Sequence, residues 1–72
     1  MSAEELDRLR RCWPEGRRSP PSACFDSWSV PGADGHLRFA VVRLAGGHYL
    51  RLDGHLALAA FGASLEAVLP PA

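Results

Sequence analysis

Residues 37–53, LRFAVVRLAGGHYLRLD, contain the two most strand-like runs in the chain, one on each side of Gly46-Gly47. Both runs are rich in apolar, β-branched and aromatic residues, which favour extended structure. A glycine pair between two such runs predicts a β-hairpin closed by a two-residue turn. That turn would place Leu44 opposite Tyr49.

A further strand is predicted upstream, over residues 24–30, CFDSWSV. The segment 31–35, PGADG, is rich in turn residues and would join this strand to the next one as a second hairpin. Val30 would then lie opposite Leu37. Together the three strands form a predicted antiparallel meander.

Alternation along these strands sorts the side chains into two faces. The predicted core face carries Trp28, Val30, Leu37, Phe39, Val41, Leu50 and Leu52. The second face carries Phe25, Ser27, Ser29, Arg38, Ala40, Val42, Leu44, Tyr49 and Arg51. This division depends on the turn, because a shift of one residue would exchange the faces of a whole strand.

Helical patterns flank the predicted strands. Ser2 and Glu5 have the spacing of a capping box, and an apolar stripe follows as far as Trp13, where Pro14 ends the first helix. Residues 55–69, HLALAAFGASLEAVL, have helical composition and predict a C-terminal helix, although Gly62 could instead end it before a second short turn. The predicted fold is α+β: an N-terminal helix, a three-stranded antiparallel meander, and a C-terminal helix packed on one sheet face.

Length and composition predict one small domain over residues 1–72, with residues 14–23, PEGRRSPPSA, as a connector between the first helix and the first strand. The eight basic residues are all Arg and are balanced by eight acidic residues, so the formal net charge is zero. A domain of this size buries only about 60% of its unfolded surface, which leaves little volume for a catalytic cleft. We therefore expect no enzymatic activity and no cofactor.

The expected location is the cytoplasm, with no membrane partner. No apolar run approaches the roughly 18 residues that a transmembrane helix requires. The charged start, MSAEELDRLRR, lacks the apolar segment of a signal peptide. In a cytoplasmic setting Cys12 and Cys24 are expected to be free thiols.

Metal binding and thiol chemistry through Cys12 and Cys24 form the weakest of three functional hypotheses. The two cysteines are twelve residues apart, as are His36 and His48, and neither spacing forms the local ligand pair of a zinc site. No local motif marks either cysteine as a nucleophile. The sequence therefore predicts no metal site and no catalytic residue.

Nucleic-acid binding is the second hypothesis, with single strands as the ligand. Aromatic rings that stack on bases, combined with Arg side chains, form the usual surface for this ligand. The second predicted face would supply Tyr49, Phe25, Arg38 and Arg51. The zero net charge weighs against this alternative.

Protein binding is the function that the sequence favours. The second face has the composition of an interface, with an apolar and aromatic centre and Arg at its margin. The predicted binding residues are Phe25, Arg38, Val42, Leu44, Tyr49 and Arg51, and a secondary basic surface comprises Arg8, Arg11, Arg17 and Arg18. The partner would be another protein, or a second copy through this face or an edge strand. In size and architecture the predicted fold is similar to small inhibitors, adaptors and accessory subunits of larger bacterial or phage-type complexes.

Overall fold

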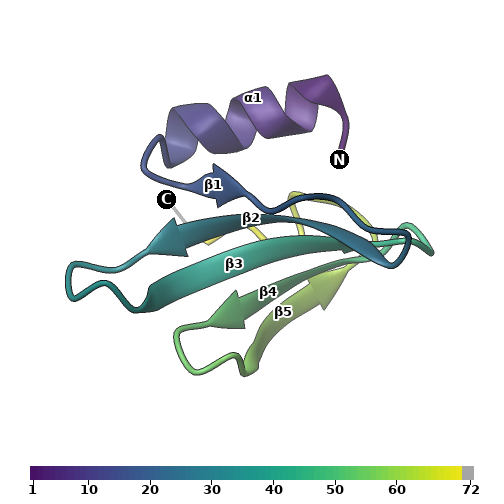
Figure 1. Cartoon of the computed structure of the whole chain (residues 1–72). Coiled ribbons are helices and arrows are strands. Elements are labelled where there is room, and N and C mark those ends of the chain that lie inside the picture. Colours follow the sequence, from purple (N-terminus) through teal and green to yellow (C-terminus); the bar gives the residue numbers. More distant parts are fainter. Residues whose placement is uncertain (71–72) are drawn as a thin grey trace.

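The computed structural model describes residues 1–70 and contains one helix and five strands in that range (Figure 1). In chain order the elements are α1 (Ala3–Cys12), β1 (Arg17–Arg18), β2 (Phe25–Pro31), β3 (Leu37–Leu44), β4 (Tyr49–Asp53) and β5 (Leu58–Gly62). The strands form one antiparallel sheet in the order β1-β2-β3-β4-β5. Residues 71–72, the last two of the predicted domain, lie outside the described residues.

Helix α1 confirms the predicted N-terminal helix and its capping box. The Ser2 hydroxyl accepts from the Glu5 backbone N–H at 3.2 Å, and the Glu5 carboxylate accepts from the Ser2 N–H at 2.9 Å. At the other end the Trp13 N–H donates to the Leu9 carbonyl, after which Pro14 follows. Local signals therefore specify both ends of this helix.

The predicted C-terminal helix is wrong, and so is the predicted three-stranded sheet. Leu58–Gly62 forms β5 and pairs with β4. The connecting turn is held by the Asp53 carboxylate, which accepts from the His55 N–H at 2.8 Å and the Ala57 N–H at 3.0 Å. A short side chain that captures two backbone donors favours a turn over a helix. The free edge of β4 then offers a ladder that outweighs the modest helix propensity of Ala and Leu.

The segment after β5 turns back under the sheet. Ala67 donates its N–H to the Ser64 carbonyl and Leu69 donates to the Leu65 carbonyl, so residues 64–69 form a turn. Gly62 allows this reversal, because a Cβ atom there would lie 2.3 Å from the Cβ of Ala67. The turn brings Leu65 and Val68 into the core.

Between the paired residues Leu44 and His48, the loop that joins β3 to β4 has three residues, one more than predicted. The Leu44 N–H donates to the His48 carbonyl, and the Gly47 N–H donates back to the Leu44 carbonyl. Gly47 has a φ of +92°, which completes a turn of three residues with its last residue in the left-handed region. Leu44 therefore lies opposite His48, and Tyr49 lies opposite Arg43. The extra residue moves every β4 side chain to the other face from the one predicted.

A β-bulge interrupts the pairing of β2 with β3. Val30 lies opposite Phe39 and Pro31 lies opposite Leu37, so Arg38 has no partner on β2. The predicted pairing of Val30 with Leu37 is therefore wrong, although Trp28, Val30, Phe39 and Val41 still share a face. Bulges redirect side chains in this way and increase local twist.

The core lies between this face of the sheet, here called the covered face, and two segments packed on it. Helix α1 contributes Leu9 and the C-terminal turn contributes Leu65 and Val68. The sheet contributes Trp28, Val30, Phe39, Val41 and Tyr49. In Figure 1, α1 runs alongside β1, and the yellow C-terminal segment passes behind the sheet.

Strand β1 falls within the predicted connector and holds a partly buried charge cluster. Arg18 makes two hydrogen bonds to the Asp26 carboxylate, at 3.0 and 2.9 Å, and the Met1 ammonium donates to the same carboxylate at 2.8 Å. The Arg18 hydrogen bonds, with help from Met1, lower the pKa of Asp26 to about 2, although burial opposes the shift. The cluster joins β1, β2 and the start of the chain.

Candidate functional site

The side of the sheet opposite the core, here called the open face, carries neither α1 nor the C-terminal turn within residues 1–70. Its side chains follow from the strand registers and the two bulges. They are Phe25, Ser27, Ser29, Pro31, Leu37, Ala40, Val42, Leu44, Leu50, Leu52, Leu58 and Phe61. An uncovered face of an antiparallel sheet is ordinarily polar, whereas this one is apolar except for two serines.

Side chains of the open face differ in how far they are exposed, and this variation is called the relief of the face. Ser27, Ala40 and Val42 are buried beneath their larger neighbours, although no other element covers them within the described chain. Phe25 on β2 remains 43% exposed, and Leu58 and Phe61 on β5 remain 62% and 56% exposed. Exposure is therefore lowest over the middle of β2 and β3 and highest on β5.

Charged side chains are absent from the open face between β2 and β5, as the residue set above shows. Arg17, which pairs with Ser29, lies at the β1 margin. His48 lies at another margin, where its ring stacks on Phe61 with centroids 5.4 Å apart. All other ionisable side chains of the described chain belong to the covered side, the helix, the loops or the C-terminal turn.

Tyr49 and Arg51 lie on the covered face, contrary to the sequence prediction. Tyr49 is buried in the core, and its hydroxyl donates to the Glu5 carboxylate on α1. Arg51 donates from Nη1 to the Val68 carbonyl at 2.9 Å, which secures the C-terminal turn. Both side chains therefore hold the covering segments in place.

Electrostatics around Tyr49 reflect this structural role. Burial, and then the hydrogen bond to Glu5, raise the pKa of the Tyr49 hydroxyl above its ordinary value. Burial would also raise the pKa of Glu5, but hydrogen bonds from Tyr49 and Ser2 lower it below its ordinary value. The pair is therefore a phenol that donates to a carboxylate across the contact between helix and sheet.

Arg38 also leaves the predicted face because of the bulge. Its guanidinium lies 5.7 Å from the centre of the Phe39 ring, and Phe39 belongs to the core. Of the six predicted binding residues, the open face keeps Phe25, Val42 and Leu44.

The predicted basic surface is divided among separate contacts. Arg8 pairs with Glu66, and Arg18 pairs with Asp26. Arg11 donates to the Asp7 carbonyl at 3.4 Å, and Arg17 is exposed on β1. These four side chains therefore do not form one continuous surface of free positive charge.

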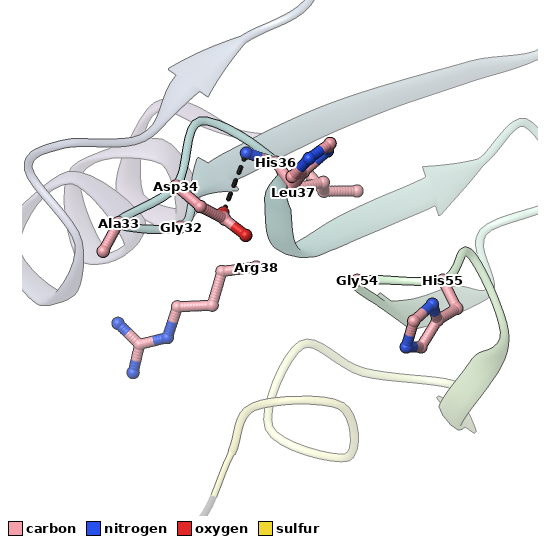
Figure 2. A pocket seen from close by; sticks show the side chains of 8 residues that line it. All are labelled: Gly32, Ala33, Asp34, His36, Leu37, Arg38, Gly54 and His55. Atoms are coloured by element: carbon pink, nitrogen blue, oxygen red, sulfur yellow. Dashed lines mark hydrogen bonds between the residues drawn. The ribbon is translucent and has the colours of Figure 1, made fainter.

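A hollow of about 600 Å³ lies between the β2–β3 and β4–β5 loops. Figure 2 shows His36 and His55 on different loops, with the Arg38 side chain extending away from both. Asp34 accepts from the His36 backbone N–H at 3.0 Å and so serves its own loop. The polar side chains around this hollow do not converge on a common point.

Metal and thiol chemistry gain no support from the arrangement of these side chains. Within residues 1–70 no group of three or more His, Cys, Asp or Glu side chains could hold a metal ion. Cys12 and Cys24 are free and exposed. The thiol hypothesis therefore rests on two separate cysteines.

Open-face residues that the sequence prediction placed on the core face or on a helix are Leu37, Leu50, Leu52, Leu58 and Phe61. Leu37 and the two β4 leucines were assigned to the core, and the two β5 residues to a helix stripe. One signal marked Leu58 and Phe61: no Asp, Glu or Arg occurs between Asp53 and Glu66. An amphipathic surface helix needs a polar face, and this run lacks charged residues to build one.

Comparisons with protein families, with curated proteins and with solved structures identify no match for this chain. The described residues include no helix whose length and apolar character would suit a membrane span. The geometry of the open face is therefore the basis for a functional conclusion.

Proposed function

We propose that this protein is a small protein-binding module, without chemistry of its own, whose open face docks against another protein chain in the cytoplasm. Small inhibitors, adaptors and accessory subunits of bacterial or phage complexes act in this way. The observation that carries the proposal is the uncharged apolar surface on which Phe25, Leu58 and Phe61 project. Contiguous apolar surfaces of this kind mark interaction sites.

The nucleic-acid alternative loses the geometry on which it depended. It required Tyr49 and Arg51 beside Phe25, but both lie on the covered face and are engaged with Glu5 and Val68. An uncharged face cannot neutralise phosphates, which supply most of the affinity for nucleic acid.

The test compares two charge substitutions at leucines of nearly equal exposure. Leu58→Glu places a carboxylate on the open face, whereas Leu56→Glu places it in the β4–β5 loop, where Leu56 is 65% exposed. Tagged wild-type and variant chains are used for affinity capture in the native host, and every captured chain is identified, including untagged copies of the protein itself. We expect Leu58→Glu to lose a partner that Leu56→Glu retains. Equal capture by both variants would show that the open face is not the binding site.

A further inference from the structure

We infer that the partner covering the open face is a second copy of this chain, which packs face to face to form a two-layer sandwich of sheets. This inference rests on the proposed function of the open face and names its partner. Three features of the face bear on it: its charge, its relief and its area.

Charge is the first feature. A two-fold interface places one surface against itself, so a face with net charge of one sign would repel its own copy. The open face has no ionisable side chain between β2 and β5, and Arg17 and His48 lie at its margins. The centre of this face therefore presents no charge that a second copy would repel.

Relief is the second feature, because exposed and buried side chains occur on the same face. Leu58 and Phe61 project from β5, while Ser27 on β2 is buried. Strands β2 and β5 lie on either side of the β3–β4 pair in the sheet order. A two-fold axis parallel to the strands, midway between β3 and β4 and midway between the two sheets, would seat β5 of each copy over β2 of the other and overlap all four strands.

Area is the third feature. Four strands spaced about 4.8 Å apart, each with about six residues in the sheet, present about 400 Å². Two copies would bury about 800 Å², which is below the roughly 1,200 Å² at which the range of stable, specific interfaces begins. The expected dimer is therefore weak and depends on concentration. Each copy would cover the open face of the other, which no segment of this 72-residue domain covers within the described residues.

The first test measures the mass of the full chain in solution by sedimentation equilibrium, from about 10 µM to about 1 mM. We expect the wild-type chain to shift from monomer to dimer across this range. Leu58→Glu should raise the dissociation constant at least about tenfold, because it buries an unpaired carboxylate. Leu56→Glu should leave the constant within about twofold, since its side chain lies in the loop beyond the strands.

A second measurement needs no variant and so does not depend on how a variant folds. Methyl resonances of Val42, Leu50 and Leu58 should move when the wild-type chain is diluted. Those of Leu9 and Val68, which lie in the core of each copy, should stay in place. A dimer in which the open-face methyl groups do not respond to dilution would place the contact elsewhere and overturn the inference.

The outcomes separate this inference from the proposed function. A chain that stays monomeric at about 1 mM, yet captures a different protein through Leu58, would overturn the second copy as partner and leave the binding module in place. A dimer that Leu58→Glu leaves intact would overturn the inference. A monomer for which Leu56→Glu and Leu58→Glu capture the same chains would overturn both proposals.

Discussion

The two faces of the sheet have similar apolar content but opposite surroundings. The covered face buries Trp28, Val41 and Tyr49 beneath α1 and the C-terminal turn, and Asp26 is paired with Arg18 at its edge. The open face buries only its smallest side chains and leaves Phe25 and Phe61 in contact with solvent. The comparison indicates that the covered face accounts for the stability of the monomer, whereas the open face has apolar surface available for a partner.

The largest expected effect contrasts the same substitution on the two sides of the sheet. Leu9→Ala removes a fully buried side chain from the core and should destabilise the protein by about 2–5 kcal/mol. Leu58→Ala should cost less than about 0.5 kcal/mol in dilute solution, where the chain is a monomer. Urea unfolding of both variants measures the difference. Similar losses would mean that the two faces contribute equally to the monomer.

Protonation of Asp26 at low pH should lower the free energy of unfolding. The folded-state pKa of about 2 lies below the ordinary 3.8, so the stabilisation is present above about pH 4 and is lost as the pH falls through 2. This shift in the pKa of Asp26 corresponds to a stabilisation of about 2 kcal/mol. The contribution is smaller because water around the half-exposed Arg18 screens the pair.

Comparing wild type with Asp26→Asn in urea at pH 5 and at pH 2 isolates this contribution, because the other carboxyl groups are common to both chains. The difference in free energy of unfolding between the two proteins should be large at pH 5 and smaller at pH 2. A difference that stays constant with pH would contradict the stabilising role of the Arg18–Asp26 pair.

Gly47→Ala tests the turn that assigns the β4 side chains to their faces. Its φ of +92° is unfavourable for a residue with a Cβ atom, yet no neighbouring atom lies within 4 Å of that position. The expected loss of about 1.5 kcal/mol therefore comes from the backbone alone. Gly46→Ala, without a positive φ, is the matched control for thermal unfolding. Equal stability of the two variants would contradict a left-handed Gly47.

Tyr49→Phe should cause the smallest loss of the substitutions on the covered face, because it keeps the buried ring and removes only the hydroxyl that donates to Glu5. We expect a loss of about 1 kcal/mol, the net value of one hydrogen bond. Combining Tyr49→Phe with Glu5→Gln in a double-mutant cycle isolates the pair. Additive losses would show that the hydrogen bond between Tyr49 and Glu5 does not stabilise the fold.

Parts of the fold could be predicted because their causes are local. The capping box of Ser2 and Glu5 and the helix end at Trp13 depend on neighbours in the chain. The shared face of Trp28, Val30 and Phe39 follows from strand alternation and from a register of the correct parity. Three of the six predicted binding residues therefore lie where they were expected.

The remaining errors have two physical causes. One additional residue in the loop before His48 exchanges the faces of Tyr49 and Leu50, and a Gly-Gly pair is compatible with loops of either length. A bulge similarly removes Arg38 from its expected face. Strand periodicity has a period of two, so each single-residue irregularity reverses every assignment beyond it.

The sequence by itself determined helix α1, the central hairpin segments and the uncharged run from Gly54 to Leu65, because these features depend on residue type and short-range spacing. Tertiary structure decided that Leu58–Gly62 is a strand and that the open face is apolar. That run can form a helix or a strand, and the unpaired edge of β4 selects the strand. Pairing with β4 satisfies the backbone and turns Leu58 and Phe61 outward, so the surface proposed to bind a partner is a consequence of sheet assembly.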